Sequence, residues 1–105
     1  MLFFVRFDVT QPANVSNSEL VETWVREAEA AIGAMEAGAV PHLWKVAGQR
    51  VVLGIVDLPT AEDLDRALGS LPIIREMGPG VKTEALPIYD YRTFAADLNA
   101  GAYGP

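Results

Sequence analysis

The sequence predicts an α+β domain with a ferredoxin-like fold, in which two helices cover one face of a four-stranded antiparallel sheet. Segments with strand-like alternation and segments with helical periodicity follow one another in the order β-α-β-β-α-β. This order is that of two split β-α-β units. The chain of 105 residues has room for a single core, and its 50% hydrophobic content is typical of a chain that folds by itself.

Composition excludes several classes of function. The net charge of −6 offers no basic surface to nucleic acid, and the absence of cysteine rules out disulfides and thiolate metal sites. The first ten residues, MLFFVRFDVT, alternate and contain Arg6, which is typical of a strand and not of a signal peptide. No apolar run has the length of a membrane span. We therefore expect a soluble cytoplasmic protein that binds neither nucleic acid nor membrane.

The first half of the chain is predicted to form a strand followed by a long helix. Phenylalanine and valine occupy alternate positions of the strand over residues 3–10. Ser16 or Asn17 can cap a helix over residues 18–37, whose apolar residues recur at helical spacing. Gly38 is a suitable residue to end that helix.

The middle of the chain is predicted to form a hairpin and a second helix. Strands are expected over residues 42–47 and 51–57, joined by a short turn. The second of these strands is apolar on both faces and should lie inside the sheet. Thr60 can cap a short amphipathic helix that starts at Ala61.

The remaining segments divide the chain into a domain over residues 1–89 and a tail over residues 90–105. Residues 71–80 are interpreted as a loop, and residues 81–88 as a strand that Pro87 either breaks or places at a sheet edge. The tail is aromatic and then glycine-rich, and we expect it to dock on a partner subunit. Apolar residues on both faces of the sheet favour a face-to-face dimer, a dimeric α+β barrel.

His42 is the only histidine in the chain and begins the predicted hairpin. No second histidine or carboxylate stands near it at the spacing of a metal site, so no metal is expected. Two interpretations remain for the imidazole: a half-buried strand residue that hydrogen-bonds to the backbone, or a group that faces a substrate. The residues alone favour the first.

Glu27 is the most informative acidic residue, because the helical wheel places it at the border of the apolar stripe. A carboxylate at such a border can be partly desolvated, which raises its pKa and makes it a useful general base. The alternative is that Glu27 extends to solvent. The wheel by itself favours this alternative.

Arg6 has two possible roles. It can hold an anionic substrate group through paired hydrogen bonds, or it can pair with Asp8, Asp57 or Glu84 on the sheet. The second role is the commoner one. Trp24 and Trp44 fit a core position more readily than a ligand platform.

The chain resembles the muconolactone isomerase family. The resemblance rests on MLFFVRFDV at the start, Glu27, GAVPHLWKVAG over residues 38–48, Asp57, and the SLP motif followed by Met77. It implies dimers of α+β barrels in larger rings such as decamers. It also implies a cofactor-independent shift of a double bond in a small lactone that carries a carboxylate, a reaction of aromatic hydrocarbon catabolism. The catalytic base of that reaction matches Glu27.

The chain also departs from the family pattern. Phe4 stands where the family usually has a histidine, and Val52 and Leu53 stand where it has polar residues. IREM and PIYDYRTF replace the family's FPYM turn and its C-terminal Cys-Arg-His segment. These changes imply a more apolar pocket and a less polar carbonyl substrate.

With the resemblance, we expect Glu27 to be the catalytic acid and base. The expected substrate-binding residues are Arg6, Phe4, Trp24, His42, Trp44 and Leu53. Two alternatives stay open: a cyclase or monooxygenase-like α+β-barrel enzyme of a biosynthetic pathway, and a non-catalytic oligomer that binds small molecules.

Overall fold

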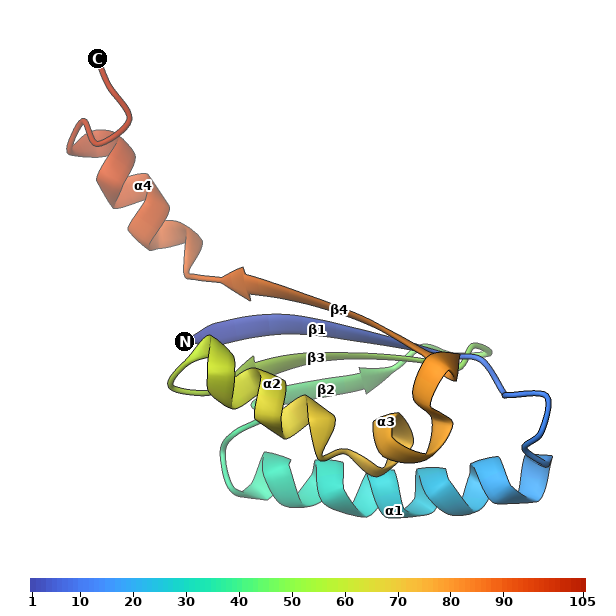
Figure 1. Cartoon of the computed structure of the whole chain (residues 1–105). Helices are drawn as coiled ribbons and strands as arrows, with labels where there is room; N and C mark the ends of the chain where they lie inside the picture. Colours follow the sequence, from blue (N-terminus) through green and yellow to red (C-terminus); the bar gives the residue numbers. More distant parts are fainter.

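The computed structural model describes all residues 1–105 and contains one four-stranded sheet in the order β2-β3-β1-β4 (Figure 1). Each strand pairs antiparallel with its neighbours. The strands are β1 (Leu2–Val9), β2 (His42–Lys45), β3 (Val51–Asp57) and β4 (Val81–Ile88). The α+β class, the interior place of β3 and the edge position of β4 are therefore confirmed, and β2 ends two residues earlier than predicted.

Three helices cover one face of this sheet, and the other face carries none (Figure 1). The helices of the chain are α1 (Asn17–Glu36), α2 (Ala61–Gly69), α3 (Pro72–Met77) and α4 (Tyr91–Asn99), with a 3-10 turn at Gly78–Gly80. Helices α1, α2 and α3 form the covering layer, and α4 follows β4 away from it. None of them combines the length and apolar character needed to cross a bilayer.

Helix α1 is delimited by local interactions that the sequence encodes. The Ser16 hydroxyl accepts a hydrogen bond from the Glu19 backbone N–H at 3.1 Å, and the Glu19 carboxylate accepts one from the Ser16 N–H at 3.2 Å. This capping box satisfies two of the free N–H groups at the helix start. Gly38 follows the last turn with φ of 87°, a left-handed conformation that glycine adopts at little cost.

The register of β1 decides which side chains face the helices. Phe3, Val5 and Val9 are buried beneath the helical layer. The alternate side chains, among them Phe4 and Arg6, point to the uncovered face because successive residues of a strand face opposite ways. The buried residues form two small clusters: Val9 with Leu20, Ile73 and Met77, and Phe3 and Val5 with Leu64.

The prediction of a loop over residues 71–80 is wrong. Pro72 starts α3 at its first position, where the missing N–H of proline is harmless. Ile73 and Met77 are one turn apart and both are buried against α1. A helix of six residues is too short to show a helical period in the sequence.

The tail over residues 90–105 contains a helix that the sequence reading did not predict. The Asp90 carboxylate caps α4 by accepting a hydrogen bond from the Arg92 N–H at 2.8 Å. No residue of α4 is buried, and the helix projects beyond the end of β4 (Figure 1). The radius of gyration is 16.7 Å, whereas a compact chain of this length has about 13 Å.

We predict that Ser16→Ala lowers the free energy of unfolding by about 1 kcal/mol, because the capping box is lost. For a domain of this size, the melting temperature should fall by roughly 4–8 °C. Ser18→Ala is the matched control, since Ser18 is exposed in the same helical turn and makes no side-chain hydrogen bond. Equal melting temperatures of the two variants would show that the cap contributes nothing.

Candidate active site

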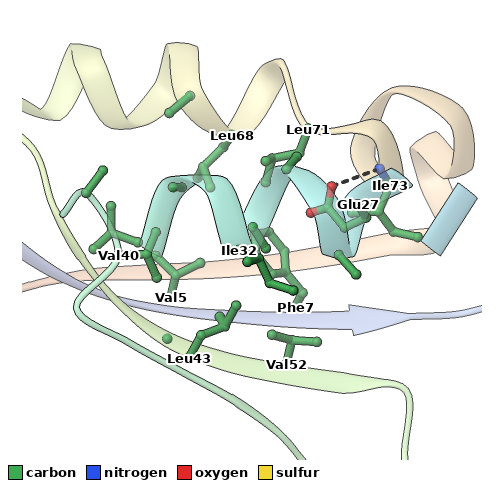
Figure 2. Close-up of a pocket in the computed structure, with 18 of the residues that line it drawn as sticks. Val5, Phe7, Glu27, Ile32, Val40, Leu43, Val52, Leu68, Leu71 and Ile73 are labelled. Carbon is green, nitrogen blue, oxygen red and sulfur yellow. Dashed lines mark hydrogen bonds between the residues drawn. The ribbon is translucent and has the colours of Figure 1, made fainter. Parts of the chain in front are cut away.

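A cavity of about 630 Å³ lies between α1 and the sheet, with α2 along one side (Figure 2). Hydrophobic residues make up 21 of the 24 that line it, and the other three are Glu27, Lys45 and Gly54. In Figure 2, Val5, Phe7 and Val52 from the sheet and Leu68 and Leu71 from the α2 side surround the space beside Glu27. An apolar cavity with one convergent polar group is the usual form of a small-molecule site.

Small side chains make room for the cavity. Ala28, Ala30, Ala31 and Ala34 line it from α1, and Ile32 is the only larger side chain of this stretch that also lines it. On the sheet side, Gly54 leaves room for its neighbour Leu43, because an added Cβ would lie 2.9 Å from Leu43 Cδ1 and would displace that side chain. The volume is therefore encoded by residue size on both walls.

Glu27 is the only carboxylate that lines the cavity. Its side chain is buried, with 8% exposure, although it stands on a helix with many exposed acids. Its Oε2 accepts a hydrogen bond from the Ile73 backbone N–H at 3.5 Å, drawn as the dashed line in Figure 2. The donor belongs to the first turn of α3, so a helix missing from the sequence prediction holds the carboxylate.

Burial raises the pKa of the Glu27 carboxyl above its ordinary range, and the Ile73 N–H lowers it by a smaller amount. No cation compensates for the burial. The Lys45 ammonium group points to the β2–β3 turn, where it donates hydrogen bonds to the carbonyl oxygens of Val46, at 2.9 Å, and Gln49. The carboxylate therefore gains basicity from its apolar surroundings.

The solvent-facing interpretation of Glu27 is wrong, and the orientation of α1 explains why. The residues that α1 buries are Leu20, Thr23 and Glu27. The more apolar stripe that includes Val21 and Val25 is turned outward, and both of these valines are more than half exposed. A helical wheel locates the most apolar direction, which in α1 differs from the buried direction.

An ion pair next to this site fixes α3 against α1. The Arg26 guanidinium donates to both carboxylate oxygens of Glu76, with Nη2 to Oε1 at 2.8 Å. Arg26 precedes Glu27 on α1, and Glu76 lies on the helix that supplies the Ile73 N–H. The pair thus supports the geometry of the Glu27–Ile73 hydrogen bond.

The structure separates the other expected site residues into two places. Trp24 lines the cavity with Glu27. Arg6 pairs across the sheet with Leu53, which pairs with Trp44, and Phe4 and His42 both pair with Ile55. Directly opposed residues share one face of a sheet, so Phe4, Arg6, His42, Trp44 and Leu53 occupy the uncovered face. Within one chain, the sheet separates Phe4, Arg6, His42 and Leu53 from Glu27, whereas Trp44 stands on the edge strand β2.

The contacts of Arg6 and His42 decide between the roles that the sequence left open for these two residues, and the exposure of Trp44 adds to them. Arg6 Nε donates to Asp8 Oδ2 at 3.1 Å, so the arginine is paired within its own strand. The expected half-buried, backbone-bonded histidine is wrong: His42 is exposed, and its ring stacks on that of Trp44 with centroids 5.5 Å apart. Trp44 also borders the cavity although its side chain is more than half exposed.

Two features of the site were missed in the sequence. The first is the Ile73 N–H, whose position depends on the unpredicted α3. The second is the group of alanines on α1, which is visible in the sequence AEAAIGA over residues 28–34. When a helix covers a sheet with a face of small residues, space remains between the helix and the sheet. Such a face in the sequence therefore indicates a cavity.

Comparison with known proteins identifies the family of the chain. The family model for muconolactone delta-isomerase matches residues 1–91. The chain belongs to the muconolactone delta-isomerase family. The muconolactone delta-isomerase of Rhodococcus opacus is 29% identical over 87 residues, which are 83% of this chain and 89% of that protein. That of Pseudomonas aeruginosa is 31% identical over 73% of this chain and 80% of its own length.

A solved structure extends this result to three dimensions. The crystal structure of a muconolactone isomerase matches with a TM-score of 0.72 and 27% identity, over 86% of this chain and 90% of that one. The ferredoxin-like α+β fold is therefore that of the muconolactone isomerases. The family match ends at residue 91, where α4 begins, so most of the projecting helix lies beyond it.

We predict that Glu27→Gln stabilises the protein at neutral pH. A carboxyl whose pKa is raised by folding binds more protons in the folded state, so stability falls as the pH rises from the ordinary glutamate pKa through the raised one. The amide removes this loss and still offers an oxygen to the Ile73 N–H. Thermal unfolding followed between about pH 4 and about pH 8 should show an advantage of the variant that grows with pH.

Glu29→Gln is the control for this measurement, because Glu29 is exposed on the same helix. It should leave the pH dependence of the melting temperature as in the unmodified protein. A Glu27→Gln variant with the same pH dependence as this control would show that the carboxylate is not desolvated.

Proposed function

We propose that the protein is a cofactor-independent isomerase that shifts a proton next to a carbonyl group, in an unsaturated lactone or a related carbonyl compound. Glu27 is the general acid and base. Family membership supports an isomerase of aromatic catabolism. The observation that carries the finer assignment is one buried carboxylate, with a raised pKa, in an otherwise apolar cavity.

The reaction needs a single group that takes and returns a proton. From a β,γ-unsaturated lactone, the Glu27 carboxylate removes a proton from the carbon α to the carbonyl; from an α,β-unsaturated lactone such as muconolactone, it removes the γ proton. In both cases the electron pair of that C–H bond spreads into the same kind of dienolate. The carboxyl O–H then delivers the proton to the far carbon of the dienolate, so the double bond moves and Glu27 is regenerated. Acid–base catalysis of this kind contributes about 10²–10⁴-fold.

Trp24 is the candidate donor for the dienolate oxygen. It lies one helical turn before Glu27 and lines the same cavity. Its indole N–H makes no hydrogen bond within the chain, although this residue is half-buried. A donor at a developing oxyanion in an apolar site contributes about 10²–10³-fold.

We predict that Glu27→Gln lowers the rate of solvent-deuterium exchange into a β,γ-unsaturated lactone by at least about 10²-fold. The probe is α-angelica lactone, with NMR as the readout. For the unmodified protein, the exchange rate should fall as the pH decreases through the raised pKa of Glu27, because only the carboxylate accepts the proton.

Glu29→Gln serves as the control for the exchange assay and should retain the rate of the unmodified protein. Unchanged exchange in Glu27→Gln would refute the assignment of the base. A folded wild-type protein that exchanges no unsaturated lactone would refute the proton shift itself.

We also propose that the protein is a homo-oligomer in which the tail, residues 90–105, docks on a second copy of the domain over residues 1–89. An antiparallel sheet with one uncovered apolar face favours such pairing, and Trp44, Leu86 and Ile88 are exposed there or at its edge. A helix of nine residues is marginal in water by itself, yet no residue of α4 is buried by its own chain. A second copy would supply apolar surface both to the uncovered face of the sheet and to α4.

We predict that Phe94→Glu with Leu98→Glu weakens the oligomer, because both side chains lie on one face of α4 and Phe94 contacts Tyr91 and Tyr103. The molar mass from light scattering during gel filtration should decrease on dilution at concentrations where the unmodified protein keeps its mass. Thr93→Glu changes an exposed neighbour on the same helix and should have no effect. An unmodified protein that runs as a monomer would contradict the proposal.

A further inference from the structure

We infer that the cavity beside Glu27 accepts an uncharged, largely hydrocarbon substrate that is bulkier than muconolactone and lacks its carboxylate. The inference rests on the proposed function for the location of the reaction. It concerns which carbonyl compound enters, and it depends on two independent properties of the cavity: its charge and its size.

The charge of the cavity argues against an anionic substrate. Glu27 and Lys45 are the only charged residues that line it. Lys45 is an exposed residue. Its ammonium group donates hydrogen bonds to the carbonyl oxygens of Val46 and Gln49 at the β2–β3 turn. A substrate carboxylate would therefore leave water without a cation to replace its hydration, which is costly in an apolar environment.

Two further arginines, one on α1 and one on the sheet, are engaged in ion pairs. Arg26 is next to Glu27 in the sequence, but its guanidinium forms the paired contact with Glu76 outside the cavity. Arg6 lies on the uncovered face of the sheet and binds Asp8. Neither guanidinium is free for an anionic substrate, which would also meet the Glu27 carboxylate.

The size of the cavity points to a substrate larger than one lactone ring with an acetate side chain. A volume of about 630 Å³ lies within the range of about 300–1,000 Å³ that holds drug-sized ligands. The alanines of α1 and the side chains of Leu43, Val52 and Leu68, which Figure 2 labels, offer hydrocarbon contacts to the part of a ligand that does not react. A hydrocarbon group on the substrate would fill this part.

The test is a series in which only charge and hydrocarbon length change: muconolactone and its methyl, butyl and hexyl esters. Binding is measured by calorimetry on Glu27→Gln, which cannot turn the ligand over, and deuterium exchange on the unmodified protein. The methyl ester should bind at least about tenfold more tightly than the acid. Affinity should then rise by up to roughly fourfold per methylene as the chain fills the cavity.

A cavity-filling variant ties the preference to this cavity. Ala31→Leu, placed in the Glu27→Gln protein, should weaken binding of the hexyl ester more than that of the methyl ester. Glu29→Leu adds the same side chain to an exposed position of α1 and should change neither affinity. If Ala31→Leu fails to fold, Ala28→Leu provides the same test from another lining position.

The outcomes separate this inference from the proposed reaction. Acid that binds as tightly as the methyl ester, or affinity that does not rise with chain length, overturns the substrate class even if exchange occurs. Esters that bind better than the acid, with no exchange in any of them, support the substrate class and overturn the proton shift. Equal effects of Ala31→Leu and Glu29→Leu overturn the assignment to this cavity.

Discussion

The burial of one carboxylate in an apolar cavity is the constraint on which the rest of this structure depends. Glu27 is kept from water by α1, by the sheet and by α3, and it has a single backbone donor, the Ile73 N–H. A charged carboxylate in this position opposes folding, because it loses its hydration. The packing of the elements around Glu27 must therefore compensate for this cost. The Arg26–Glu76 pair and the packing of Ile73 and Met77 hold α3 against α1 and thereby hold the donor.

Helix α1 has two faces with different tasks. Its inner face carries Glu27 and the alanines that leave space for a ligand, and its outer face displays Val21 and Val25 to the surroundings of the chain. The domain therefore has apolar surface both in the cavity and on its exterior. The two small core clusters and the projecting α4 are in keeping with a subunit that gains stability from contacts with further copies.

The sequence predicts the elements that have strong local signals. The alternation of β1, the capping candidates Ser16 and Asn17 and the glycine at position 38 place the first strand and α1 to within a residue, and β4 with Pro87 is an edge strand. Helix α3 is missed because six residues show no period. The burial of Glu27 is missed because the side of α1 that meets the sheet is decided by tertiary packing, whereas the wheel follows hydrophobicity alone.

The most direct test of the central claim is the titration of the Glu27 carboxyl itself, followed by NMR on protein with carbon-13-labelled glutamate and assigned through Glu27→Gln. The account predicts that this carboxyl loses its proton above the ordinary pH range of a glutamate side chain, and that a bound neutral lactone moves the midpoint further upward. A Glu27 carboxyl that titrates within the ordinary glutamate range would contradict a desolvated base, and with it the interpretation of the cavity as an active site.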